Sequence, residues 1–251
     1  MLLILGFISL LGKSCYNVTT FTFFIIFDTM KKFFFLFFLM STLLINAQKL
    51  PKGFVYLLNI DKSIQSELRY LTHNNFIGKP IDGYLKDVII TTLPTAKALH
   101  RIQNKLRPFG LSLKIFDAYR PQQAVNHFVR WVKSLKDTVM KQQYYPNVQK
   151  KNLFKLGYIA SKSGHTRGST VDVTIVDLKT GEELNMGSPY DFFGISSHPK
   201  HKKINKTQRS NRLLLRRLML ENGFRPYKNE WWHFTLNNEP FKKTYFNFVV
   251  K

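Results

Sequence analysis

Two histidines and one aspartate are the residues of this sequence that could together bind a metal ion. His165 lies in a segment rich in Gly and Ser, and Asp172 follows it seven positions later within a β-branched run. A loop of that composition exposes the imidazole and a strand holds the carboxylate in place, so both can reach one cation. A second imidazole, His233, lies near the C-terminus. Two imidazoles and one carboxylate leave the fourth position of a tetrahedral zinc ion to water, as in catalytic zinc sites.

Glu230 and Arg120 could supply the other groups of a zinc-dependent hydrolase. Glu230 lies three residues before His233, close enough to take a proton from an attacking water without binding the ion. Arg120 follows a predicted strand and precedes a predicted helix, so its guanidinium is held at the sheet end, where it could stabilise an oxyanion. Each residue also has a purely structural explanation, namely a salt-bridged Glu230 beside a core His233, or pairing of Arg120 with a carboxylate such as Asp117. The combination favours catalysis more than any part does.

At these residues the sequence resembles the zinc D-Ala-D-Ala peptidases. The family pattern Ser-x-His-x-x-Gly-x-x-x-Asp stands at 163–172 and Glu-x-x-His at 230–233. The resemblance is closer to the D-alanyl-D-alanine dipeptidases of the vancomycin-resistance type. It runs from about residue 54 to the C-terminus and departs slightly at Ala118, where the family usually has glycine. Further matching stretches are Glu67–Tyr70, Asn74–Pro80, Tyr144–Asn147 and Met186–Phe192.

The resemblance implies a reaction and a set of roles. It implies hydrolysis of the dipeptide D-Ala-D-Ala into two D-alanines, with one Zn²⁺ per chain, and the export signal described below would place this reaction in the cell envelope. His165, Asp172 and His233 would be the zinc ligands. Glu230 would be the general base, and Arg120 would stabilise the transition state.

The same resemblance places Asp191 and Ser163 near the free amino group of the substrate. A buried carboxylate at Asp191 would pair with the ammonium of a free dipeptide. A longer peptide has no charge at that point, so the acid would stay unpaired at a cost of several kcal/mol. We therefore expect the site to prefer dipeptides.

Two other functions stay open at this level. A carboxypeptidase or endopeptidase acting on longer peptidoglycan stem peptides would use the same ligands. A non-enzymatic module that binds the cell wall would use zinc only structurally. The water position that two histidines and one aspartate leave open argues against this last alternative.

The secondary-structure pattern around these residues predicts a single α+β domain, with a mostly antiparallel central sheet flanked by helices. Helical and strand patterns are mixed along the chain without a regular βαβ alternation, and we find no repeat or long linker after residue 48. Three strands are predicted, over Leu111–Ile115, Ser169–Val176 and Trp231–Leu236. The first predicted helix is opened by Thr91–Pro94 and stopped by Pro108 and Gly110, and the last is capped by Thr207 and stopped by Gly223. Between them, a helix from Pro121 is predicted to bury Val125, Phe128, Trp131, Val132 and Leu135.

The first 47 residues differ from the rest and predict export. Met30-Lys31-Lys32 followed by an apolar run and a small residue at Ala47 is typical of a signal peptide over 30–47. Residues 1–29 then form a surplus extension, and 48–251 form the zinc dipeptidase domain. We expect a periplasmic protein without a stable membrane span after cleavage, although a retained membrane anchor is the alternative.

The chain is strongly basic. The first 47 residues hold three Lys and one acid, so residues 48–251 carry 35 basic and 14 acidic side chains, a net charge of +21. Such a charge attracts polyanions. Because export argues against nucleic acid, anionic envelope polymers or lipid surfaces are the expected partners beside the dipeptide substrate. A charge that reflects only a basic proteome or solubility is an equal alternative. We expect the segment 197–203, which holds His198 and His201, to be a solvated basic loop rather than a second metal site.

Overall fold

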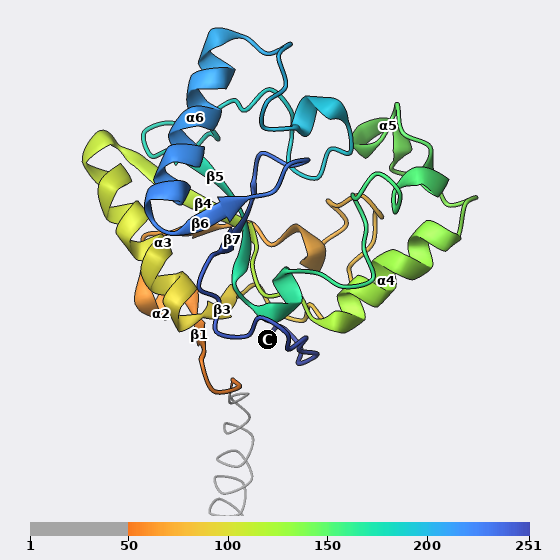
Figure 1. The fold of residues 1–251 in the computed structure, drawn as a ribbon, viewed down its shortest axis with the longest axis horizontal. Helices are drawn as coiled ribbons and strands as arrows, with labels where there is room; N and C mark the ends of the chain where they lie inside the picture. Colours follow the sequence, from red (N-terminus) through yellow and green to blue (C-terminus); the bar gives the residue numbers. More distant parts are fainter. Residues whose placement is uncertain (1–49) are drawn as a thin grey trace, which may run out of the picture. The chain divides into compact units, whose positions relative to one another are not determined.

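The computed structural model describes residues 50–251 (Figure 1). The predicted extension at 1–29 and signal peptide at 30–47 lie outside these described residues. Among the described helices, none is long and apolar enough to cross a membrane.

A five-stranded sheet forms the centre of the domain. Its strand order is β2-β4-β5-β7-β6, and only the β2–β4 pair is parallel. A smaller antiparallel pair joins β1 to β3. These sheets and the helices beside them confirm the predicted α+β fold with a mostly antiparallel central sheet. The strands are β1 (Phe54–Tyr56), β2 (Gln65–Ser66), β3 (Ile90–Thr92), β4 (Leu111–Asp117), β5 (Thr170–Asp177), β6 (Phe224–Pro226) and β7 (His233–Leu236).

Three long helices flank the sheet. Helix α3 (Leu93–Leu106) contacts β4, and α6 (Lys206–Glu221) contacts β6. Helix α4 (Gln122–Lys133) follows β4 and lies on the other side of the domain from α3 (Figure 1). The shorter helices are α2 (Leu57–Ile60), α5 (Lys141–Tyr144) and the 3₁₀ turns η1 (Arg69–Leu71), η2 (Arg107–Phe109), η3 (Lys150–Asn152), η4 (His165–Arg167) and η5 (Ile195–Ser197).

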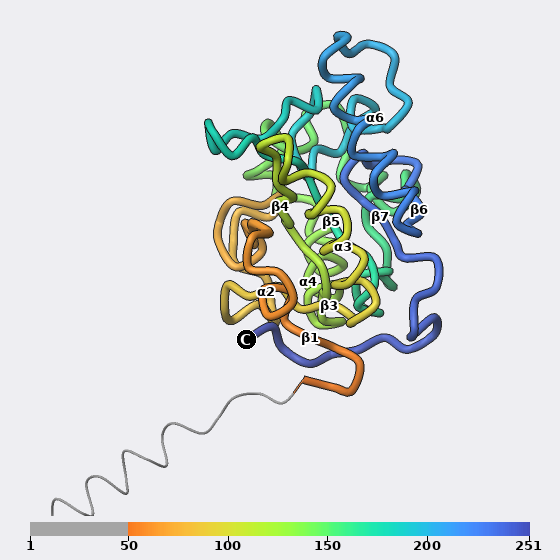
Figure 2. The backbone as a smooth tube through the Cα atoms, turned by 90° about the vertical axis from the view of Figure 1, so that its left-hand side faces the viewer, coloured from red at the N-terminus to blue at the C-terminus, as the bar shows by residue number. Residues whose placement is uncertain are grey.

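The C-terminal segment returns past the first strand of the domain (Figure 2). Val250 pairs with Tyr84 in a parallel bridge, and the Tyr56 hydroxyl donates to the carbonyl of Lys251 at 2.8 Å. The tail therefore ties the edge beside β1 and β3, at the end of the molecule away from α6.

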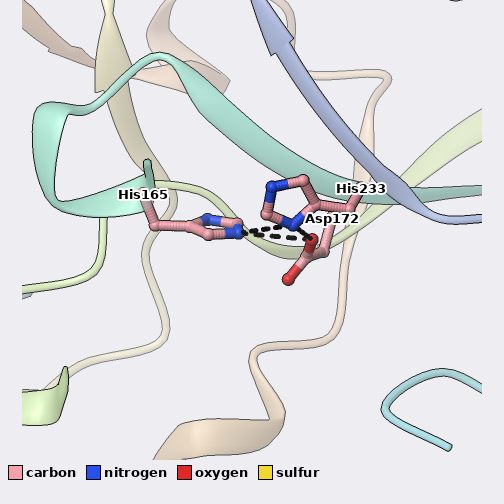
Figure 3. Close-up of side chains that lie close together, drawn as sticks. All are labelled: His165, Asp172 and His233. Atoms are coloured by element: carbon pink, nitrogen blue, oxygen red, sulfur yellow. Dashed lines mark hydrogen bonds and ion pairs between the residues drawn. The ribbon is translucent and has the colours of Figure 1, made fainter. Parts of the chain in front are cut away.

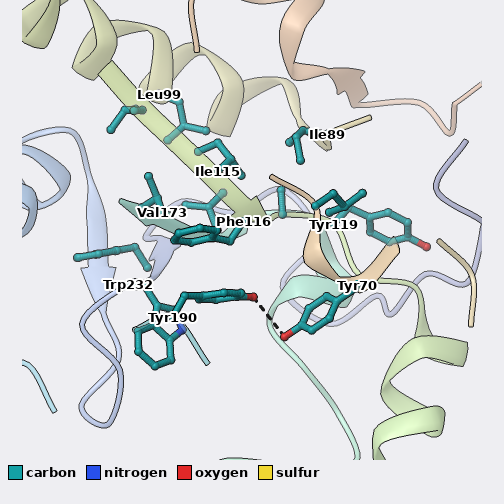
Figure 4. Close-up of a cluster of buried hydrophobic side chains, with 14 of the residues drawn as sticks. Tyr70, Ile89, Leu99, Ile115, Phe116, Tyr119, Val173, Tyr190 and Trp232 are labelled. Atoms are coloured by element: carbon teal, nitrogen blue, oxygen red, sulfur yellow. Dashed lines mark hydrogen bonds between the residues drawn. The ribbon is translucent and has the colours of Figure 1, made fainter. Parts of the chain in front are cut away.

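The core lies on both faces of β4 and β5. Ile115, Phe116 and Val173 are fully buried, and Phe116 stacks on Tyr190 with ring centroids 4.3 Å apart (Figure 4). Tyr190 in turn meets the edge of Trp232. Burial of each such side chain contributes roughly 1.5–3 kcal/mol. The strands that carry the site are thus held rigidly from both sides.

Two details of the helix predictions are wrong. Helix α4 ends at Lys133, so Leu135 lies beyond the buried stripe and is 54% exposed. The cap of α6 is Asn205 rather than Thr207. The Asn205 side chain accepts from the backbone of Gln208 at 2.9 Å, and the Gln208 side chain accepts from the backbone of Asn205 at 3.0 Å. This reciprocal box satisfies two free backbone donors, which a cap at Thr207 would leave unpaired.

Candidate active site

The sheet register aligns three polar residues on neighbouring strands. Asp172 in β5 faces Asp117 in β4 on one side and His233 in β7 on the other. The β4–β5 register shifts between Ile115 and Asp117, and this irregularity brings Asp117 opposite Asp172. Two acids and one imidazole therefore stand in a row across the centre of the sheet.

The loop before β5 brings His165 to this row. The loop passes close to Phe54 at Gly168, where φ is 80° and an added Cβ would lie 2.2 Å from the Phe54 ring, so only glycine fits. Arg167 fixes the loop from outside through two hydrogen bonds to Glu239, at 2.7 and 3.0 Å. His165 Nδ1 donates to the backbone carbonyl of Ala118 at 2.7 Å. That bond sets the tautomer and leaves Nε2 with a lone pair facing the sheet.

The three predicted metal ligands meet at one point (Figure 3). His165 Nε2 lies 3.3 Å from Asp172 Oδ1 and 3.3 Å from His233 Nδ1, and the distance from His233 Nδ1 to Asp172 Oδ1 is 3.1 Å. The expectation that the Gly-rich loop exposes the His165 imidazole is wrong, because the loop folds back onto the sheet and buries it. Asp172 is also buried, whereas His233 is partly exposed. Three donor atoms that lie this close could bind one cation together.

The Asp172 carboxylate fits a metal ion better than it fits a hydrogen-bond network. Its Oδ1 atom is buried and has no hydrogen-bond partner among the described residues. Burial alone would raise the pKa of Asp172, but the His165 and His233 imidazoles hold that pKa below its usual range. Burial also lowers the pKa of His233, which favours the neutral imidazole that binds metals. The donor set of two imidazoles and one carboxylate is one that zinc accepts.

Glu230 stands beside this cluster. Its Oε2 lies 3.3 Å from His233 Nδ1, and the residue is nearly buried. Burial first, and then the Asp172 and Asp191 carboxylates, raise the pKa of Glu230 well above its usual value. A carboxylate in such a place takes up a proton more readily than one in water, as a general base must.

Arg120 faces the cluster from the short segment between β4 and α4. Its Nε donates to Asp117 at 2.8 Å, and its Nη2 donates to Asp172 Oδ2 at 3.4 Å. The guanidinium also lies over the rings of Tyr70 and Phe128, at 5.0 and 5.2 Å. The expected structural pairing with Asp117 is present, and the same pairing holds the cation rigidly at the edge of the site.

Asp191 is joined to the cluster by two tyrosines that our sequence reasoning missed. Tyr70 OH donates to Asp191 Oδ2 at 2.9 Å, and Tyr190 OH donates to Asp172 Oδ2 at 3.1 Å. The two tyrosine hydroxyls lie 3.2 Å apart (Figure 4). Both tyrosines stand in stretches that match the family pattern, which is the one signal that could have found them. Burial first, and then the Asp172 carboxylate, raise the pKa of Asp191 to about 8.

The chain matches a known protein family over almost the whole described region. The family profile of the D-Ala-D-Ala dipeptidases, peptidase family M15, matches residues 51–251. The chain belongs to this family. The prediction made from the motifs is thereby confirmed.

Several relatives of the dipeptidase family are similar over most of the chain. A D-alanyl-D-alanine dipeptidase of Enterococcus faecalis is 42% identical over 80% of this chain and 100% of its own length. One of Streptomyces coelicolor is 40% identical over 78% of this chain and 98% of its own. A VanY D,D-pentapeptidase structure, solved with Zn(II), covers 62% of this chain and 77% of its own at 15% identity, with a TM-score of 0.37.

The candidate site of this dipeptidase family member opens into a small cavity, which we call the active pocket. It measures about 220 Å³, which suits a small ligand better than a polymer. Ser163 lines it, and the Ser163 hydroxyl accepts from the backbone of His165 at 3.2 Å. All seven residues singled out in the sequence lie in or beside this pocket. Its lining includes Tyr70, Arg120, Tyr158, Ser163, Asp172, Asp191, Phe193, Tyr227, Glu230 and His233.

Arg212 of α6 holds the loop that carries Asp191. This buried guanidinium donates to the backbone carbonyls of Met186, Ser196 and His198. Burial lowers the pKa of Arg212 to about 10. Asp191 itself has a φ of 61°, the one positive value among the described non-glycine residues, so the loop is held in a strained conformation.

We expect Arg212→Lys to raise KM for D-Ala-D-Ala, the substrate of the family, about tenfold while kcat changes less. Lysine cannot make the forked set of hydrogen bonds to the three backbone carbonyls. Steady-state kinetics measures this split. The matched control is Arg217→Lys, since Arg217 is an exposed residue of the same helix and pairs with Glu221. Equal kinetics of the Arg212 variant and the control would refute the positioning role.

Proposed function

We propose that this protein is an exported zinc-dependent D-alanyl-D-alanine dipeptidase. One observation carries the proposal. His165 Nε2, His233 Nδ1 and Asp172 Oδ1 lie within 3.3 Å of one another, with Glu230 3.3 Å from the same His233 nitrogen. Membership of the D-Ala-D-Ala dipeptidase family supports the substrate.

The residues at this point fit a zinc ion, since the orphaned Asp172 Oδ1 and the two imidazole nitrogens form a suitable donor set. His165, Asp172 and His233 would hold it. When bound, zinc polarises the scissile carbonyl and lowers the pKa of water at the open position.

The protein residues then perform the proton transfers and stabilise charge. Glu230 accepts a proton from the attacking water and returns it to the departing amine, which its raised pKa favours. Arg120 uses Nε and Nη2 for Asp117 and Asp172, and within residues 50–251 no protein atom accepts from its Nη1. That Nη1 group faces the negative charge that develops on the carbonyl oxygen.

Asp191 and Ser163 bind the free amino group in this proposal. The raised pKa of Asp191 shows how poorly its charge is compensated in the protein alone. An ammonium group within hydrogen-bond distance would stabilise the ionised form. This closed, charged end limits the substrate to a dipeptide.

Asp191→Asn tests this limit and keeps the size of the side chain. Asn also tolerates the left-handed backbone at this position. We expect kcat/KM for free D-Ala-D-Ala to fall about 100-fold, whereas turnover of N-acetyl-D-Ala-D-Ala, which lacks the ammonium, changes little. If both substrates respond equally, Asp191 does not select the dipeptide.

The same pair of substrates separates the alternative peptidases. A carboxypeptidase or endopeptidase acting on longer stem peptides would cleave the acylated dipeptide at least as fast as the free one. A dipeptidase cleaves the free form and loses that activity when a chelator is added. Hydrolysis that a chelator does not affect would contradict the metal-dependent proposal as a whole.

We further propose that residues 30–47 direct export and that 48–251 form the dipeptidase domain, with 1–29 as a surplus extension. The basic n-region and short apolar run support this proposal. N-terminal sequencing of the protein recovered from the periplasmic fraction tests it. A mature chain that begins near residue 48 is the expected result.

A further inference from the structure

A second cavity, larger than the active pocket, lies where the segment before α6 meets the β6–β7 turn. It measures about 620 Å³. Five permanent cations line it, and we call it the basic pocket. They are Lys200, Lys202, Lys203, Arg216 and Lys228.

Among residues 50–251, the cations of the basic pocket have no acidic partners. Residues 192–220 contain eight Lys and Arg but no Asp or Glu. Within the described part of the chain, no carboxylate lies within 4.0 Å of any of the five. Arg217, next to Arg216 on α6, does have such a partner, since it pairs with Glu221 at 2.8 Å. Within residues 50–251, Lys206, Arg209 and Arg212 of α6 also have no carboxylate within 4.0 Å, so the unbalanced charge continues from the cavity along this helix.

The backbone around the basic pocket is held in place before any ligand binds. Arg209 donates to the carbonyl of Lys202 at 3.0 Å, and Arg212 donates to that of His198 at 2.9 Å. Pro199 and Pro226 form stiff parts of the wall. A pocket fixed in this way binds an anion without the cost of ordering the loop.

A smaller cavity of about 270 Å³ continues the same surface. It shares Lys200, Lys202 and Arg216 with the basic pocket and adds Arg209. Cations therefore follow one another over two adjoining hollows, which matches a chain of anionic groups better than a single small ion. A flat membrane surface fits less well, because the sites are concave and Ile195 is the one strongly exposed apolar residue in the larger hollow.

We propose that the basic pocket and its smaller neighbour bind a polymer that carries phosphate groups along its length. Closely spaced phosphates neutralise several Lys and Arg side chains at once, and each Arg can bind a phosphate through two donors. Tyr227 lines both the basic pocket and the active pocket, and His198 Nε2 lies 3.3 Å from the hydroxyl of Tyr158, which lines the active pocket. The bound polymer would hold the enzyme with its active pocket beside the polymer surface.

Calorimetric titration of the full protein with tripolyphosphate at low ionic strength tests this site. We expect saturable binding at one site, weakened as salt is added. Lys200→Glu combined with Lys202→Glu should weaken binding at least tenfold, because both side chains line both cavities. Neither side chain makes a hydrogen bond or ion pair within residues 50–251, and both are exposed, so a thermal melt should show an unchanged fold.

The matched control makes the same change of net charge elsewhere. Lys97→Glu with Lys136→Glu alters two exposed lysines outside both cavities and should change tripolyphosphate affinity less than twofold. Equal weakening by the two pairs would overturn the proposal, because attraction would then reflect total charge. Absence of saturable binding would overturn it too, including the case in which only phosphatidylglycerol vesicles bind. The titration contains no dipeptide, and both lysine pairs leave the proposed zinc site unchanged, so any heat from chelation of zinc by tripolyphosphate is common to them and the comparison does not depend on the proposed reaction.

Discussion

Replacing Glu230 with Gln is expected to lower kcat for D-Ala-D-Ala by roughly three orders of magnitude, because the amide cannot accept the proton of the attacking water. The change keeps the shape of the side chain beside His233. Zinc bound to the protein should stay at one ion per chain, since Glu230 lies beside the ligand cluster without belonging to it. Steady-state kinetics together with metal analysis of the purified variant measures both quantities.

The control for this variant is Glu182→Gln, which removes an exposed carboxylate outside the active pocket. It should leave kcat and zinc content unchanged. Loss of zinc from the Glu230 variant would make Glu230 a ligand rather than a base. If the variant kept more than about a tenth of the activity, Glu230 would not be the residue that transfers the proton.

Replacing His233 with Ala is expected to abolish both zinc binding and turnover. The substitution removes one of three donor atoms that lie within 3.3 Å of one another, and it leaves the buried Asp172 carboxylate with less compensation. We expect zinc content to fall from one ion per chain to near zero and kcat to fall at least 10⁴-fold, as after exhaustive chelation. Zinc added back should restore the chelated wild type but not the variant.

Thermal unfolding gives an independent measure of the same site. A ligand that binds only the folded protein stabilises it by about 4 kcal/mol at a thousand times its Kd, so zinc should raise Tm of the wild type and not of the His233 variant. His73→Ala, which alters an exposed histidine outside the active pocket, is the control. An equal rise of Tm in all three proteins would show that zinc binds elsewhere.

Local patterns in the sequence were enough to predict the helices and strands and the residue types of the candidate site. The alternation at Leu111–Ile115 and the β-branched run at Ser169–Val176 predicted β4 and β5 to within two residues. The Gly-rich loop and the Glu-x-x-His motif indicated the candidate metal ligands, because residue type decides which atoms can bind a metal. The ends of helices were less predictable, as at Leu135 and Thr207. Differences of a few tenths of a kcal/mol in capping and packing decide at which residue a helix starts or stops.

The wider electrostatic setting could not be predicted from those patterns. The sequence predicted a solvated basic loop at 197–203, and Lys200, Lys202 and Lys203 are exposed, but it did not predict that this loop lines a cavity together with Arg216 and Lys228. Likewise, no spacing rule connects Tyr70 with Tyr190, which lie 120 positions apart. Contacts between distant segments depend on which faces pack together, and single-sequence periodicity carries no such information.

By itself, the sequence determined the family, the mixed α+β class and the set of side chains able to bind zinc and move a proton. Only the tertiary structure decided that Asp117, Asp172 and His233 stand level on three strands, with His165 turned onto them from outside the sheet. The physical reason is that strand register is set by the packing of both sheet faces and by the irregularity near Asp117. A shift of one residue would turn Asp172 to the opposite face and remove it from the metal site.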